Sequence, residues 1–247
     1  MRIILSGMKG FMGSEVVKLC EAGVRDGQVV AGVDVKADGT ESIPCYKRFD
    51  DVTEAADCIM DFSHFSLTEP LLDFAVRKKL PLVLATTGQN DAQKEMIRAA
   101  AASIPVFYAA NYSMGVALLL ELAKQTAKAF PDADIEIVEM HHNRKVDAPS
   151  GTALAIFDAL KSVRKNAVKN LGRSGVQKRA PDEIGIHAIR MGNVIGVHEV
   201  IVGTQNQTIT LRHEAHSRAL FAEGALAAAD FIMGKPAGLY NMNDLIK

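Results

Sequence analysis

The first 113 residues alternate between short apolar runs and longer stretches in which apolar residues recur at helical spacing. The runs predict strands at residues 2–6, 28–34, 56–63, 81–88 and 104–113. Helices are predicted after residue 13, at residues 71–80, and at residues 91–102, with Asn90 or Asp91 as the N-cap of the last. Strands that alternate with helices predict a parallel, doubly wound sheet with right-handed crossovers.

The pattern changes after residue 113. One long helix is predicted from Met114 to Phe130, with an inner face of Leu118, Leu119, Leu122 and Ala123. Residues 133–142 alternate between polar and apolar positions, and so do later segments at 185–193, 196–204 and 207–215. These four segments predict a mixed or antiparallel sheet. A further apolar helix is predicted at 217–233, and we expect it to return to the first domain.

These elements predict an α/β protein with two domains. A Rossmann-like, doubly wound domain of residues 1–111 and 217–247 is expected to bind a dinucleotide. Residues 112–216 are expected to form a smaller α+β domain that binds the substrate and supports an oligomer through its open sheet. The basic stretch 161–179 lacks periodicity and is interpreted as a solvated loop.

Composition narrows the class of protein. Hydrophobic residues make up 48% of the chain and charged residues 23%, the balance of a soluble globular protein with a sizeable core. The net charge of −1 provides no general attraction to nucleic acid or to an anionic membrane. The three cysteines show no C-x-x-C spacing, which favours free thiols in a reducing compartment. Without a signal-peptide pattern or an apolar run of about 20 residues, a cytoplasmic location is expected.

A glycine-rich turn follows the first predicted strand. Gly7, Gly10 and Gly13 are spaced G-x-x-G-x-x-G, which departs from the usual G-x-G-x-x-G pattern and also fits a plain tight turn. Asp34 ends the second strand 21 residues after Gly13, near the offset of about 20 at which a carboxylate binds a ribose hydroxyl. The combination predicts a dinucleotide site. The segments 85–87 and 109–112 follow other strands and should share its rim.

The segment from Glu139 to Thr152 carries the second candidate site. His141 and His142 are adjacent, and in an extended strand they point to opposite sides, so only one can face a given target. Histidine serves as a proton donor near neutral pH, and Lys145 offers a compact positive charge. Ser150, Gly151 and Thr152 open a predicted helix, whose N-terminus attracts anions. The chemistry indicated is protonation of a small anionic molecule.

A metal centre is not predicted there. The histidine pair has no third ligand at recognisable spacing, and the charge of Lys145 would oppose a cation. The remaining histidines at positions 64, 187, 198 and 216 are interpreted as structural or exposed.

The stretch H-H-N-R-K-V-D-A-P-S-G-T-A at 141–153 resembles the signature of the 4-hydroxy-tetrahydrodipicolinate (dihydrodipicolinate) reductases. The resemblance runs along the whole chain, with further matching segments, in order, at 85–88, 109–116, 189–200, 213–226 and 238–242. It implies that NADH or NADPH binds the first domain. It also implies that hydride passes to a six-membered dicarboxylate ring, with loss of water, in diaminopimelate and lysine biosynthesis. Members are typically homotetramers built through the sheet of the second domain.

The resemblance also implies residue roles. His141 would donate the proton, Lys145 would act as second acid and carboxylate partner, and His142 would contact the substrate. Ser150, Gly151 and Thr152 would hold a substrate carboxylate at the helix N-terminus. The residues implied to line the cofactor are Gly7, Met8, Lys9, Gly10, Phe11, Met12, Asp34, Ala85, Thr86, Thr87, Ala109, Ala110, Asn111 and Tyr112.

The chain departs from the family pattern at the cofactor turn, where Phe11 replaces the usual arginine. Asp34 would repel a 2′-phosphate, whereas Lys9 and Lys36 would attract one, and the balance favours NADH with use of both cofactors possible. The role of Glu214 is open. Two alternatives stand beside the reductase: another two-domain NAD(P)-dependent enzyme, such as an amino-acid dehydrogenase, and a non-catalytic NAD-binding protein.

Overall fold

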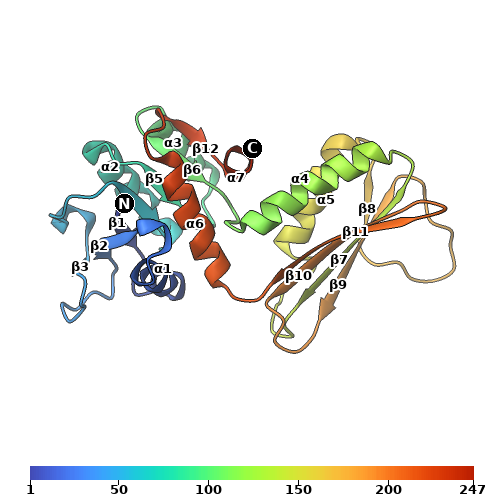
Figure 1. Ribbon diagram of the computed structural model, residues 1–247, viewed down its shortest axis with the longest axis horizontal. Helices are drawn as coiled ribbons and strands as arrows, with labels where there is room; N and C mark the ends of the chain where they lie inside the picture. Colours follow the sequence, from blue (N-terminus) through green and yellow to red (C-terminus); the bar gives the residue numbers. More distant parts are fainter. The chain divides into compact units, whose positions relative to one another are not determined.

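The computed structural model describes residues 1–247 as two compact units (Figure 1). The first comprises Met1–Met114 and Ala219–Lys247, and the second comprises Gly115–Arg218. No helix in the structure is both long and apolar enough to cross a membrane.

A seven-stranded parallel sheet forms the first unit, in the order β12-β6-β5-β4-β1-β2-β3. The strand order reverses between β1 and β4, which lie side by side, so this is the doubly wound sheet that the sequence predicts. The strands are β1 (Arg2–Ser6), β2 (Gln28–Val33), β3 (Cys45–Tyr46), β4 (Cys58–Asp61), β5 (Leu82–Leu84), β6 (Pro105–Tyr108) and β12 (Gly238–Tyr240).

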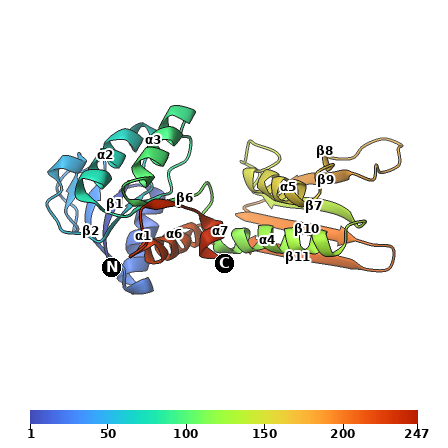
Figure 2. The same cartoon turned by 90° about the horizontal axis from the view of Figure 1, so that it is seen from above.

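Helices cover both faces of this sheet (Figure 2). Helices α1 (Phe11–Glu21) and α6 (Ala219–Ile232) pack together on one face, and α2 (Thr68–Lys78) and α3 (Asp91–Ala101) lie on the other. Because both faces are buried, the strands are apolar throughout instead of alternating. The shorter elements are α7 (Met242–Leu245) and 3₁₀ helices at Val24–Asp26, Phe49–Asp51 and Phe65–Leu67.

The second unit is a five-stranded mixed sheet in the order β11-β10-β7-β9-β8. β7 (Asp134–His141) pairs parallel with β9 (Glu183–Arg190) and antiparallel with β10 (Gly196–Gly203), which pairs antiparallel with β11 (Thr208–Ala215). Helices α4 (Met114–Ala129) and α5 (Gly151–Val163) cover one face (Figure 1). There Ile135 and Ile137 of β7 pack against Leu119 of α4 and Ile156 of α5.

Several sequence-based expectations need correction. The inner face of α4 is formed by Val116, Leu119, Ala123 and Ala127, whereas Leu118 and Leu122 are 50% and 38% exposed. The stretch 161–179 is not all loop, because α5 continues to Val163 and β8 (Val168–Asn170) pairs with β9.

The predicted strands at 56–63, 81–88 and 104–113 are longer than β4, β5 and β6. Their polar ends leave the sheet because side chains there close local turns: the Ser63 hydroxyl donates to Asp61 at 2.5 Å, and the Gln89 amide donates to the Thr86 carbonyl at 2.9 Å. The predicted N-cap of α3 is confirmed as Asn90, within a capping box.

Candidate functional site

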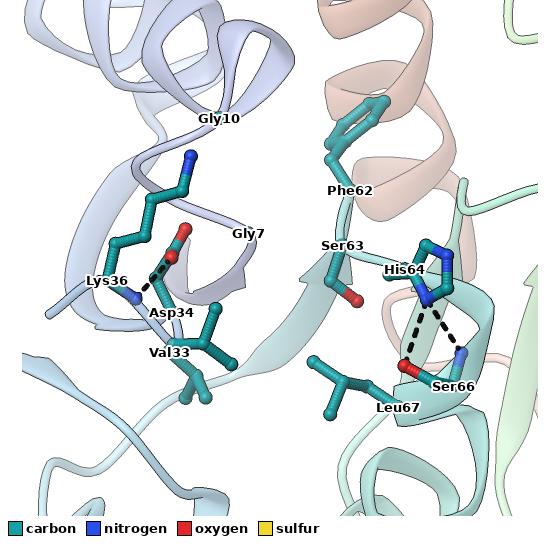
Figure 3. A pocket seen from close by; sticks show the side chains of 11 residues that line it. Gly7, Gly10, Val33, Asp34, Lys36, Phe62, Ser63, His64, Ser66 and Leu67 are labelled. Atoms are coloured by element: carbon teal, nitrogen blue, oxygen red, sulfur yellow. Dashed lines mark hydrogen bonds between the residues drawn. The ribbon is translucent and has the colours of Figure 1, made fainter.

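A pocket of about 440 Å³ opens in the first unit at the carboxyl ends of the strands (Figure 3). Gly7 follows β1, Asp34 follows β2, and Ser63 and His64 follow β4. The pocket therefore lies where the strand order reverses, the position at which doubly wound sheets bind their ligands.

The glycine turn shapes one wall of this pocket. Gly7 has a φ of +78°, and a Cβ atom there would lie 2.4 Å from the carbonyl oxygen of Phe62. A Cβ at Gly13 would lie 2.2 Å from the Gly7 carbonyl oxygen, so neither position tolerates a side chain. Gly10 is the N-cap of α1 and supplies no side-chain cap. A helix N-terminus that opens on a cradle of glycines is suited to a phosphate group.

Asp34 closes the other wall. Its carboxylate accepts hydrogen bonds from the backbone N–H groups of Lys9 and Lys36, each at 2.9 Å. Figure 3 shows Asp34 and the Lys36 chain beside Gly7, across the pocket from His64. Each carboxylate oxygen accepts one of these bonds and keeps capacity for a further donor, such as a ribose hydroxyl.

The side chain of Lys9 is held by two carboxylates. Its ammonium group lies 2.9 Å from Asp38 and 2.6 Å from Glu41. Hydrogen bonds to Glu41 and Asp38 raise the pKa of Lys9 well above its ordinary value. A hydrogen bond from Thr40 and then the one from Lys9 lower the pKa of Asp38. The charge of Lys9 is therefore already matched by two acidic groups.

The other residues implied to line a cofactor are placed differently. Of the fourteen implied positions, only Gly7, Gly10 and Asp34 line this pocket. Met8 and Tyr112 bury their side chains: Met8 packs on Gly32, and the Tyr112 hydroxyl donates to the carbonyls of Leu84 and Phe107. Thr86 is buried, whereas Thr87, Ala110 and Phe11 are exposed.

The pocket also contains a residue that the sequence did not single out. His64 is exposed, one of the two states expected for it, and it also lines the pocket, with its Nδ1 atom 2.9 Å from the Ser66 hydroxyl. The sequence could have indicated this position, because His64 follows a buried strand and so lies at the same sheet edge as Gly7.

A cluster of polar side chains occupies one end of the second unit. The strand register places Glu139 of β7 opposite His198 of β10, and His141 opposite Arg190 of β9. Residues two apart on a strand face the same side, so Glu139 and His141 continue the row of Ile135 and Ile137. That face is covered by the two helices, and the N-terminus of α5 meets the cluster.

Glu139 is the centre of this cluster and is fully buried. One oxygen accepts from the backbone N–H of Ser150 at 3.0 Å and from Arg190 at 2.7 Å. The other lies 2.6 Å from Nδ1 of His141 and accepts from Arg190 at 2.8 Å. Burial acts to raise the pKa of Glu139, but the hydrogen bonds from Arg190 and His141 outweigh it, and the net shift is downward.

His198 borders the same cluster. It is 4% exposed, its Nε2 atom lies 3.1 Å from the Ser150 hydroxyl, and its ring stands edge-on to that of His141 with centroids 5.2 Å apart. Burial, and then the nearby His141, lower the pKa of His198 to about 4. His198 is therefore neutral near pH 7 and adds no charge beside His141.

The remaining candidates lie at the edge of this cluster. The ammonium of Lys145 is 2.8 Å from Asp147, and its hydrogen bond lowers the pKa of that carboxyl. Desolvation and then the charge of Arg144 lower the pKa of His142, whose Nδ1 atom is buried without a hydrogen-bond partner.

The start of α5 has the predicted form. Ser150 is confirmed as the N-cap, since its hydroxyl accepts from the backbone N–H of Ala153 at 3.2 Å. Gly151 and Thr152 form the first turn, and a Cβ at Gly151 would meet nothing within 4 Å. Across the chain, no group of three or more His, Cys, Asp or Glu side chains is arranged to hold a metal ion.

Glu139 and Arg190 are two residues of the cluster that were not singled out from the sequence, and His198 was given no part in the site there. The period-two pattern could have indicated Glu139. This residue falls on the apolar face of its strand, where a carboxylate without partners would be unfavourable. Its partner on β9 is evident only from the pairing of the strands.

Comparisons with known proteins agree with the architecture. Residues 1–112 match the family model for the N-terminus of dihydrodipicolinate reductase, and residues 115–246 match that for its C-terminus. The chain is 43% identical over 248 residues to the 4-hydroxy-tetrahydrodipicolinate reductase of Caldanaerobacter subterraneus subsp. tengcongensis, covering 100% of this chain and 98% of that one. It is 41% identical to the Clostridium tetani reductase, covering 99% and 96%. The dipicolinate-bound dihydrodipicolinate reductase of Paenisporosarcina sp. TG-14 superposes with a TM-score of 0.85 at 25% identity, covering 98% of each chain.

The lowered pKa of His198 predicts a pH dependence of stability. Because the folded state binds this proton only near pH 4 and an unfolded histidine binds it near pH 6.5, acidification favours unfolding. Stability from this group is present above about pH 6.5 and falls by about 2 kcal/mol between about pH 7 and about pH 5. Urea unfolding of His198→Gln should show a shallower pH slope than the unsubstituted protein, and equal slopes would contradict the burial of an uncharged His198.

Proposed function

Because the chain belongs to the dihydrodipicolinate reductase family, we propose that it reduces 4-hydroxy-tetrahydrodipicolinate to tetrahydrodipicolinate with a reduced nicotinamide dinucleotide. The step belongs to diaminopimelate and lysine biosynthesis. The observation that carries the proposal is the cluster at the end of β7, where a proton donor, a cation and a helix N-terminus occupy one short segment of a chain that matches the family throughout.

The first unit fits the cofactor. The glycine cradle of Gly7 and Gly10 at the start of α1 would receive the pyrophosphate, and Asp34 would accept from the ribose hydroxyls of the adenosine half. When bound, the reduced nicotinamide supplies the hydride. His64 is added as a pocket residue, whereas Met8 and Tyr112 would contribute backbone atoms because their side chains are buried.

The cofactor preferred at this pocket is NADH. A 2′-phosphate would approach the anionic Asp34, and the ammonium of Lys9, whose backbone N–H donates to Asp34, is already paired with Asp38 and Glu41. Lys36 offers a second cation at the pocket wall, which supports residual use of NADPH.

The second unit fits the substrate. Two carboxylates of the ring require two anion sites, and Lys145 together with the N-terminus of α5 at Ser150, Gly151 and Thr152 supplies them. His141 presents a proton to the substrate, and the partly buried His142 contacts it. A homotetramer built through the sheet of this unit, which the family resemblance implies, stays a prediction.

A coupled assay tests the function. The protein is mixed with pyruvate, aspartate semialdehyde and the synthase that condenses them, and oxidation of NADH or NADPH is followed by absorbance. Oxidation that depends on the synthase is expected with NADH above NADPH. No oxidation of either cofactor would reject the reductase. Reduction of NAD+ or NADP+ in the presence of an amino acid would favour an amino-acid dehydrogenase instead.

Replacement of Lys145 separates an effect on catalysis from an effect on cofactor binding. Lys145→Ala should lower kcat by about 10²- to 10⁴-fold, because an acid and a carboxylate partner are lost together. The dissociation constant of NADH, measured by fluorescence titration, should not change, since Lys145 belongs to the second unit. Lys165→Ala, which removes an exposed lysine of the same unit, is the matched control and should keep full turnover. A large loss of NADH affinity in Lys145→Ala would count against these assignments.

Release of Lys9 tests the cofactor preference. In the double variant Asp38→Asn/Glu41→Gln, the ammonium loses both anionic partners and can meet a 2′-phosphate. The ratio of kcat/KM for NADPH to that for NADH should rise about tenfold, the effect of one charge-assisted contact. Adding Lys9→Met to this variant should cancel the gain. An unchanged ratio in the double variant would show that this pairing does not govern selectivity.

A further inference from the structure

The carboxylate of Glu139 has its full complement of hydrogen bonds. Each carboxylate oxygen accepts two hydrogen bonds, and one of the two comes from Arg190. The second donor is the backbone N–H of Ser150 for one oxygen and the ring of His141 for the other. A fully buried carboxylate with four donors has no remaining lone pair aimed at a ligand. Glu139 therefore does not bind the substrate, and any effect on the reaction must pass through the groups that it holds.

The bond to His141 fixes which ring nitrogen is presented. An ionised carboxylate only accepts hydrogen bonds, so Nδ1 of His141 must carry a proton and donate it to Glu139. The Nε2 atom is thereby the one left to exchange a proton with another molecule. Space for it is kept by Gly196 at the start of β10, where a Cβ would lie 3.2 Å from Nε2.

Arg190 holds the carboxylate in this orientation. Its guanidinium contacts both oxygens of Glu139 and also donates to the carbonyl of Asp147 at 2.6 Å, in the loop that carries Lys145. A two-pronged contact restricts rotation of the carboxylate in a way that a single bond does not. Strands β7 and β9, the 145–147 loop and the N-terminus of α5 are thus joined through one anion.

We propose that Glu139, held by Arg190, is a positioning residue that sets the tautomer and direction of the His141 ring and ties it to the carboxylate-binding turn at Ser150. This inference rests on the proposed function of His141 as proton donor. The other titratable groups beside that ring are His198 on β10, whose ring stands edge-on to it, and the adjacent His142.

The chain provides a matched control on the same strand. Glu136 also pairs with a histidine and an arginine, lying 2.9 Å from His187 Nε2 and 3.3 Å from Arg179 Nε. Glu136 is three positions before Glu139 on the strand, an odd offset, so its side chain lies on the opposite face of β7 from Glu139 and His141. Glu136→Gln therefore removes a strand carboxylate from a histidine and an arginine without touching the cluster around His141.

The kinetic test compares these two variants. Glu139→Gln keeps the size of the side chain and should lower kcat by about 10- to 100-fold, with a much smaller change in KM and none in NADH affinity. Glu136→Gln should keep the turnover of the unsubstituted enzyme. Turnover of Glu139→Gln equal to that of Glu136→Gln, in a preparation whose unsubstituted enzyme is active, would overturn the proposal.

A spectroscopic test does not depend on turnover or on the folding of a variant. NMR of the imidazole nitrogens in the unsubstituted protein should show the neutral ring of His141 with its proton on Nδ1. Finding the proton predominantly on Nε2 would reject the proposal whether or not the enzyme reduces the expected substrate. An inactive protein with the Nδ1 proton would instead reject only the proposed function.

Discussion

The burial of one negative charge constrains the second unit more than any other interaction. Taking the Glu139 carboxylate out of water costs several kcal/mol, and this is offset only when every lone pair finds a donor in good geometry. The donors are His141 of β7, Arg190 of β9 and the backbone of Ser150, the N-cap of α5, so these elements must meet in one register for the Glu139–Arg190 pair to form. Loss of one partner of such a pair typically costs about 3–5 kcal/mol, which makes the cluster sensitive to its own geometry.

In the first unit, carboxylates at the strand ends also need hydrogen-bond donors. Asp61, at the end of β4, is 1% exposed, and burial raises the pKa of its carboxyl although the Ser63 hydroxyl donates to it. Asp34, at the end of β2, instead satisfies part of its carboxylate with backbone N–H groups of the glycine turn and the following loop. The same residue type thus serves as a buried strand-end group in one place and as a partly satisfied acceptor facing a pocket in the other.

Local patterns predicted the elements because their causes are local. The glycine turn, the strand that ends in Asp34 and the Ser150 cap depend on residues within one turn or one strand, and all are present in the structure. The predicted inner face of α4 is wrong at Leu118 and Leu122. The helical period alone cannot tell which of two neighbouring apolar rows packs on the sheet. Residues 141–153 marked the second candidate site, but the grouping of His141, Glu139 and Arg190 needs the register of two strands, β7 and β9, which no single segment contains.

A lysine within a motif is a weak guide to its own function, because its charge can be taken up by acidic groups from elsewhere in the chain. Lys9 stands in the glycine turn and by position alone would attract a phosphate, yet Asp38 and Glu41 of a later loop hold its ammonium. Lys145 also has an acidic neighbour, but there the partner is the single, half-exposed Asp147. One exposed ion pair contributes little free energy and can be exchanged for a ligand carboxylate at small cost, whereas two carboxylates on one ammonium must both be displaced. The number of partners, more than the charge itself, therefore separates Lys145, whose ammonium could exchange its one partner for a ligand carboxylate, from Lys9, which joins two carboxylates of a loop.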